Sequence, residues 1–228
     1  MPRKPRFYIG GIPCHVIQRG NNHGACFFSD ADHLLYLECL EDASKRFGVQ
    51  VHAYVLMTNH VHLLMTPDNS DGISRVMQSL GRRYVQQINF RYRRSGTLWD
   101  GRHKSSLIDS ETYFLTCMRY IELNPVRANM VERPENYRWS SYLANATTKP
   151  DPIVNRHSLY MALGEDDACR RDAYRRLFDE EIRQTDLSFI RQSIQSSSPL
   201  GSERFMHEIE KTVGRSTGFF KRGRPGQR

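Results

Sequence analysis

The sequence lacks any long run of apolar residues. No window approaches the roughly 18 consecutive apolar residues that a membrane span requires. The N-terminal residues Arg3, Lys4 and Arg6 are basic, but no apolar segment of the kind found in secretory signals follows them. We therefore expect a protein that has no membrane partner and that stays in the cytoplasm.

Cysteine is also scarce and widely spaced. None of the cysteines forms a Cys-x-x-Cys pair, and their number is odd; they are Cys14, Cys26, Cys39, Cys117 and Cys169. This spacing argues against a disulfide framework and against a thiolate zinc site, and it is typical of a reducing compartment. The sequence also lacks the Gly-x-x-x-x-Gly-Lys-Ser/Thr loop that cradles nucleotide phosphates, so no motif indicates a nucleotide cofactor.

Lysine is rare in a chain that is nevertheless basic. Only 6 of the 33 basic residues are lysine and the rest are arginine, and the formal net charge is +8. Arginine binds phosphate through two parallel hydrogen bonds and stacks on bases, so this composition favours a polyanion such as nucleic acid as the partner.

The apolar pattern predicts an α+β fold. Strands are expected where apolar residues alternate or run together, and helices where they recur every three or four positions. Their order is β-α-β-β-α-β followed by a helix, which is the ferredoxin-like arrangement of an antiparallel sheet with helices on one face. The strands are expected at 12–19, 49–57, 60–66 and 101–108, and the helices at 30–47, 73–94 and 110–124.

The composition changes after residue 145. Residues 145–152 are polar with two prolines and read as a linker, and the segment that follows reads as short helices of mixed charge. The last residues, from 214 onward, contain five basic side chains and no acidic one, which predicts a flexible basic tail. We therefore expect a principal domain at 1–145, a helical region at 150–213 and the tail at 214–228.

The helix expected at 73–94 carries basic residues opposite its apolar stripe. At 100° per residue, Arg75, Arg82 and Arg93 fall close together on the polar face. Two interpretations stay open, namely a face that contacts phosphates and an ordinary solvated surface.

His60 and His62 form the sharpest local feature of the sequence. Because residues i and i+2 of a strand point to the same face, the two imidazoles can meet one cation. Taken alone, such a pair is also compatible with hydrogen-bonded core or surface histidines.

Tyr120 and Asn124 lie one turn apart on the last helix of the unit. That helix can pack near the central strands, where Asn124 would add an amide oxygen to the two imidazoles. Such a mixed set of ligands suits Mg²⁺ or Mn²⁺ better than structural Zn²⁺. The competing interpretations are a half-buried core aromatic for Tyr120 and a helix N-cap before Pro125 for Asn124.

Several motifs in one order strengthen the chemical interpretation. They are LMTNHVH at 56–62, LWDGR at 98–102 and RYIELNPVRA at 119–128, with CHVIQRGNN at 14–22 and RGRP at 222–225. In this combination the chain resembles the HUH single-tyrosine transposases, and most of all the REP-associated tyrosine transposases. The resemblance spans about residues 5–145 and, weakly, the tail. One departure is His103, where an aromatic residue is expected.

The resemblance implies a role for each matching residue. His60 and His62 correspond to the metal-binding histidines, Tyr120 to the nucleophile, and Asn124 to the polar residue that completes the site for Mg²⁺ or Mn²⁺. Family members cut single-stranded DNA beside palindromic hairpins and hold the product as a 5′-phosphotyrosine, which places them at the nucleoid. Arg222 and Arg224 of the tail resemble a minor-groove hook, although a disordered basic end has the same composition.

Two other functions remain compatible with the sequence. A noncatalytic nucleic-acid-binding module can use the same fold, although the aromatic strand motif of RNA-recognition domains is missing. A metallonuclease that activates water would use the histidines and leave Tyr120 dispensable.

Overall fold

The computed structural model describes residues 6–217, and its centre is a four-stranded antiparallel sheet. The strand order is β2-β3-β1-β4. The strands are β1 (Cys14–Arg19), β2 (Val49–Met57), β3 (His60–Pro67) and β4 (Lys104–Leu107). The α+β class and the antiparallel sheet predicted from the sequence are confirmed, and β4 is shorter than expected.

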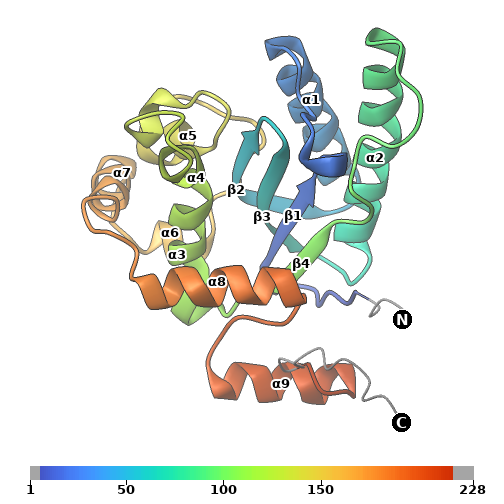
Figure 1. The fold of residues 1–228 in the computed structure, drawn as a ribbon. Coiled ribbons are helices and arrows are strands. Elements are labelled where there is room, and N and C mark those ends of the chain that lie inside the picture. The colour runs from blue at the N-terminus through green and yellow to red at the C-terminus, as the bar shows by residue number, and fades with distance from the viewer. Residues whose placement is uncertain (1–5, 218–228) are drawn as a thin grey trace.

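Helices cover both faces of this sheet (Figure 1). Helices α1 (Asp30–Arg46) and α2 (Gly72–Arg91) contact each other and lie together on one side, as predicted for the helices of the β-α-β-β-α-β unit. Helix α3 (Ser110–Glu122), which follows that unit, packs against β2 and β3 from the other side. Alternate residues of β3 therefore face different helices, and this alternation is what places the site.

Helix α1 is fixed at both of its ends. Ser29 and Asp32 form a capping box at the N-terminus, and the chain leaves the helix at Gly48, which has a φ of 61°. The buried Asp32 carboxylate also accepts a hydrogen bond from Tyr92 at 2.9 Å and pairs with Arg91 at 2.5 Å. Because Arg91 belongs to α2 and Tyr92 is its C-cap, this carboxylate joins the two helices of one face.

Helix α2 ends earlier than its apolar stripe suggests. Tyr92 is its C-cap, and Arg93 adopts a left-handed conformation with a φ of 50°. The amide of Arg94 then donates back to the carbonyl of Asn89 at 2.8 Å, which closes the helix. The prediction that Arg93 shares a helical face with Arg75 and Arg82 is therefore wrong. Arg75 and Arg82 do share a face, two turns apart, and both are exposed.

The chain after α3 consists of short helices and loops that pack back onto the sheet. Asp151 accepts a hydrogen bond from Tyr54 of β2 at 2.7 Å, and Ser106 of β4 donates to the carbonyl of Ser198 at 2.6 Å. The predicted division into three regions stays a prediction. The helices are α4 (Asn124–Arg127), α5 (Tyr142–Ala146), α6 (Ser158–Met161), α7 (Asp167–Arg176), α8 (Gln184–Ser196) and α9 (Glu203–Val213), with 3₁₀ turns at Asn21–His23 and Pro134–Asn136.

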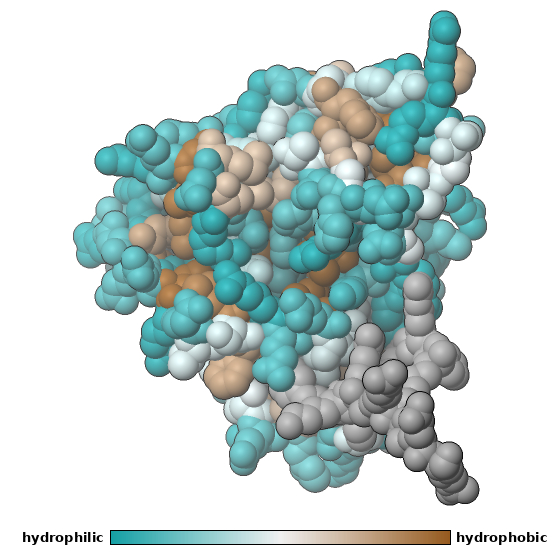
Figure 2. Space-filling model, in the orientation of Figure 1, coloured by the Kyte–Doolittle hydropathy of each residue, from teal (hydrophilic) through white to brown (hydrophobic). Residues whose placement is uncertain are grey.

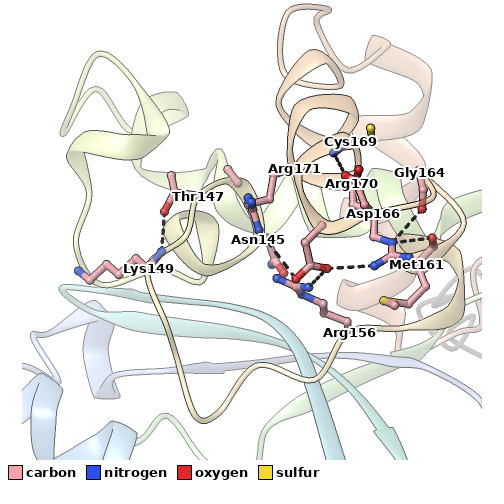
Figure 3. Close-up of polar contacts among 12 residues, drawn as sticks. Asn145, Thr147, Lys149, Arg156, Met161, Gly164, Asp166, Cys169, Arg170 and Arg171 are labelled. Carbon is pink, nitrogen blue, oxygen red and sulfur yellow. Dashed lines mark hydrogen bonds and ion pairs between the residues drawn. The ribbon is translucent and has the colours of Figure 1, made fainter.

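Arginine side chains hold the loop between α6 and α7 (Figure 3). Arg170 donates to the carbonyl oxygens of Met161 and Gly164 at 3.1 and 2.9 Å. Arg170 and Arg156 both pair with Asp167, at 3.0 and 2.6 Å. Much of the basic charge in this region thus serves the fold and is neutralised by acidic partners.

The surface of the described residues is mainly hydrophilic on the side drawn in Figure 2, with hydrophobic residues in separate patches. No helix within 6–217 has the length and apolar character needed to cross a membrane.

A buried carboxylate connects α3 to the helices that follow it. Glu122 is fully buried, and its oxygens accept hydrogen bonds from Ser141 (2.6 Å), Asn145 (2.9 Å) and Tyr174 (2.8 Å). Burial raises the pKa of Glu122 to about 7. Tyr174 belongs to α7 and Asn145 to α5, and Asn145 also donates to the carbonyl of His52 in β2, so these bonds tie α3 to α5, α7 and the edge of the sheet.

We expect Tyr174→Phe to lower the free energy of unfolding by about 1.5–3 kcal/mol, because one oxygen of the buried carboxylate loses its only donor among the described residues. Tyr142→Phe is the control, since the Tyr142 ring is also buried and its hydroxyl makes no hydrogen bond within the described part of the chain. Urea unfolding of both variants measures the difference. Equal stabilities would show that the bond to Glu122 contributes nothing.

Candidate active site

The two histidines of β3 and the tyrosine of α3 meet on one face of the sheet. His60 and His62 point to the same side, with ring centroids 5.1 Å apart. The ring of Tyr120 lies edge-on to His62 at 5.9 Å between centroids. The sequence prediction that α3 brings Tyr120 to the histidine pair is borne out by this geometry.

A third histidine, His15, completes the buried group. It lies on β1, the neighbour of β3, and its Nε2 atom is 2.8 Å from Nδ1 of His62. Its ring centroid is 5.8 Å from that of Tyr120. His15 belongs to the CHVIQRGNN motif, and its role was not predicted because only the pairing of β1 with β3 reveals this contact. The alternation of side chains along β1 was the signal in the sequence that could have placed His15 on the face of the histidine pair.

Burial keeps the three imidazoles neutral at physiological pH. It lowers the pKa of His15 to about 3 and that of His60 to about 4, and nearby arginines act in the same direction. The pKa of His62 is also lowered well below its usual value, first by burial and then by the neighbouring histidines. Neutral imidazole is the form that binds a metal ion.

The outer nitrogens of His60 and His62 are available to a ligand. Nδ1 of His60 donates to the amide oxygen of Asn59 at 2.7 Å, so Nε2 carries the lone pair. Nδ1 of His62 is engaged by His15, and neither Nε2 atom has a hydrogen bond within residues 6–217. A bond at Nδ1 that leaves Nε2 open is the usual arrangement of a metal-binding histidine.

Asn124 is buried, and its amide is already engaged. Its Nδ2 donates to the carbonyl oxygens of Tyr120 (2.9 Å) and Ile121 (3.3 Å) at the end of α3. Its Oδ1 accepts a hydrogen bond from Arg127 at 3.1 Å, and no described hydrogen bond joins it to a histidine. Asn124 therefore lies one turn from Tyr120, as predicted, with its oxygen turned to an arginine.

Arg127 is the cation nearest to Tyr120, and sequence reasoning gave it no role. Its guanidinium lies over the tyrosine ring, 4.0 Å from the centroid, and Nη1 donates to the Tyr120 carbonyl at 3.2 Å. Its Nε is buried without a partner in the described part of the chain. The tyrosine, only 5% exposed, is thus enclosed by imidazole edges and one arginine.

Other candidate residues lie elsewhere or outside the described residues. Arg75 and Arg82 belong to α2, which covers the opposite face of the sheet from Tyr120. Arg222 and Arg224 fall outside residues 6–217. Within those residues, no three or more His, Cys, Asp or Glu side chains are grouped so that they could share a metal ion.

Comparison with known protein families decides the relationship. The family described as IS200-like transposases matches residues 10–124, half of the chain, from the loop before β1 to Asn124. The chain belongs to this family. The matched segment contains the whole sheet, the histidine pair and Tyr120, and this chain is an enzyme of the transposase family.

A solved structure shares the fold of this transposase. A REP-associated tyrosine transposase bound to a REP hairpin is 16% identical with a TM-score of 0.56, and the match covers 69% of this chain and 93% of that one. A proposed transposase of Deinococcus radiodurans R1 is 23% identical with a TM-score of 0.36, and the match covers 53% and 96% of the two chains. No relative was found among curated protein sequences.

Proposed function

We propose that this transposase cuts and rejoins single-stranded DNA beside palindromic hairpins, with Tyr120 as its nucleophile. The observation that carries the proposal is the position of Tyr120, edge-on to His62 in a buried group of neutral imidazoles. A similar protein of the same fold was solved with a REP hairpin bound, which supports hairpin DNA as the substrate. The high proportion of arginine supports it too.

The reaction is a transfer of a phosphodiester to tyrosine. The phenolic oxygen of Tyr120 forms a bond to the scissile phosphorus, and the bond from phosphorus to the 3′-oxygen breaks. The proton lost by the phenol balances the one gained by the departing 3′-hydroxyl, and the 5′-phosphate stays on the protein. Because the phosphodiester is conserved in this linkage, attack by another 3′-hydroxyl reverses the step and joins strands.

Tyrosine needs help in this reaction, since its usual pKa is near 10. The guanidinium of Arg127 over the ring stabilises negative charge that develops on the phenolic oxygen, and its unpartnered Nε can donate to a phosphate oxygen. The enclosed position of the ring keeps competing water away from the phosphorus.

The open Nε2 atoms of His60 and His62 fit a divalent cation, and both side chains are neutral as such a ligand requires. His60 and His62 would hold Mg²⁺ or Mn²⁺, and the ion would supply polarisation and orientation of the scissile phosphate. Asn124 would supply the third protein ligand through the oxygen that now accepts a bond from Arg127. For His62, an open Nε2 requires the proton on Nδ1, and His15 is the acceptor for it.

Tyr120→Phe should abolish the covalent adduct with a labelled hairpin, because the variant keeps the ring and its packing and loses only the attacking oxygen. Binding of the hairpin should change little. Tyr113→Phe, in the same helix, is the matched control and should still form the adduct. The assay is a denaturing gel after incubation with Mn²⁺.

The same gel separates the rival functions. Cleavage by Tyr120→Phe at a rate near that of the wild type would refute the tyrosine mechanism and indicate activated water. Binding without cleavage by either protein would indicate a noncatalytic module.

His15→Phe should weaken Mn²⁺ binding by about 10- to 100-fold, because His62 loses the acceptor that holds its proton on Nδ1. His33→Phe is the control, since His33 is stacked between Phe27 and Trp139, apart from the site. Electron paramagnetic resonance of free Mn²⁺ measures the affinity without DNA. Unchanged affinity in His15→Phe would show that His15 does not support a metal ligand.

Arg82→Ala should reduce the salt dependence of DNA binding, with the log–log slope falling by about 0.7 for the loss of one phosphate contact. Arg82 is exposed and has no ion pair among the described residues. Arg83, its neighbour on α2, pairs with Asp42 at 3.0 Å, so Arg83→Ala should change the slope less. Equal slopes in all three proteins would mean that this face of α2 is only solvated.

A further inference from the structure

A basic cavity lies on the other face of the sheet from Tyr120. Its volume is about 420 Å³, within the usual range for sites that bind small organic molecules. Four segments form it: the chain before β1, the end of β1, the first turns of α2 and the loop before β4. The residues that matter below are Arg6, Gln18, Arg75, Gln78, Arg102 and His103.

Gln18 supplies the observation that points to a ligand. It pairs with Val61 across β1 and β3, whereas His62 pairs with Ile17, so Gln18 faces away from the histidines. The side chain is only 8% exposed, and its Oε1 atom is buried with no hydrogen-bond partner in the described part of the chain. A buried acceptor without a donor is costly to a fold, and a ligand that brings an N–H group removes that cost.

The cationic side chains around this amide are held in place. Arg6 donates to the ring of His103, with 2.8 Å between Nη1 and Nε2, and the Tyr8 hydroxyl lies 2.7 Å from the same nitrogen. Burial, Arg6 and Arg102 lower the pKa of His103 to about 3, so its ring stays neutral and Nε2 has one lone pair to accept from Arg6 or from Tyr8.

The cavity continues into the exposed face of α2. Arg75 and Gln78 line the cavity, and Arg82 lies on the same face of the helix one turn beyond Gln78. Arg75 is positioned by the ring of Phe47, 4.6 Å from its guanidinium, and by Asp71 at 3.6 Å. The phosphates of a DNA strand can therefore follow α2 from Arg82 past Arg75 to the cavity and lie near arginine side chains along this path.

We propose that this cavity binds one unpaired nucleotide of the DNA substrate, with the base on Gln18 and the phosphate on Arg6 and Arg102. An amide side chain pairs with the hydrogen-bonding edge of a base, and guanidinium groups pair with phosphate oxygens. This inference rests on the proposed function, because it assumes that single-stranded DNA is the substrate. The cavity selects which stretch of DNA is held, while Tyr120 acts on the other face of the sheet.

The test is an abasic scan combined with one substitution. Hairpins that carry a single abasic site at each unpaired position in turn are titrated against two proteins, both with Tyr120→Phe to prevent cleavage. One is otherwise unchanged and the other also carries Gln18→Leu. At one position the abasic site should weaken binding by the first protein about tenfold or more. At that position the second protein should bind the abasic hairpin and the intact hairpin with the same affinity.

Three controls accompany the scan. Gln18→Leu replaces a side chain whose buried Oε1 has no partner among the described residues by an apolar group of similar size, so its melting temperature should not fall. Gln50→Leu, at an exposed position of β2, should leave the abasic profile unchanged. Arg102→Ala, also at an exposed residue, should weaken intact and abasic hairpins by the same factor, because it removes a phosphate contact.

Identical abasic profiles with and without Gln18→Leu would overturn the proposal. A free deoxynucleoside monophosphate that binds as tightly as the hairpin, with no position sensitive to base removal, would also overturn it and assign the cavity to free nucleotides. The covalent adduct of proteins that retain Tyr120, measured at saturating DNA, separates this inference from the proposed function. If the adduct forms but Gln18→Leu does not change the abasic profile, only the inference about the cavity is wrong. If Gln18→Leu does change the profile but no adduct forms, only the tyrosine chemistry is wrong.

Discussion

The carboxylate of Glu122 fixes the position of α3, and the geometry of the site depends on that position. The helix contacts β2 and β3, and near its end it carries a fully buried acidic group with three donors, two of which also bond to β2. A buried carboxylate with a missing partner is strongly unfavourable, so the three bonds form together or the helix moves. Two residues before Glu122, Tyr120 points to the sheet. The packing of α5 and α7, which follow the matched family region in the chain, thus determines where the tyrosine lies.

The face of the sheet under α3 is unusual for a protein core. Where aliphatic side chains would normally fill the space, three neutral imidazoles are grouped, and two of them, His15 and His62, pack against a tyrosine. Burial keeps the histidines uncharged, and the hydrogen bonds at Nδ1 of His60 and His62 direct their open nitrogens to one side. On this face of the sheet, polar imidazoles thus take the place of apolar packing. The helices α1 and α2 on the other face supply the large hydrophobic cluster that compensates for it, with Tyr36, Leu40 and Tyr84 fully buried there.

Local pattern predicted much of this architecture, and distant contacts account for what it missed. The strand over Val49–Met57 followed from its apolar run, and the alternation of β3 placed His60 and His62 on one face. His15 and Gln18 gained meaning only from the pairing of β1 with β3, which involves residues more than 40 positions apart. The end of α2 was also missed, since a left-handed Arg93 replaces the glycine that usually signals such a cap. The predicted linker at 145–152 is polar because its side chains bond to β2 and Glu122, and composition does not distinguish such buried bonds from solvation.

One strand, β1, contributes to both faces of the molecule. His15 and Ile17 face Tyr120, whereas Gln18 faces α2 and the basic cavity, and the difference is the parity of their positions. A shift of one residue in the pairing of β1 with β3 would exchange the faces, placing His15 in the hydrophobic cluster and Gln18 against the tyrosine. The register is held on both sides, by β3 along six pairs and by β4 along four. In the proposed function, this single register therefore couples the reacting group to the surface that would hold the DNA. A substitution that loosened β1 would affect cleavage and recognition together, although the residues responsible lie on opposite sides of the sheet.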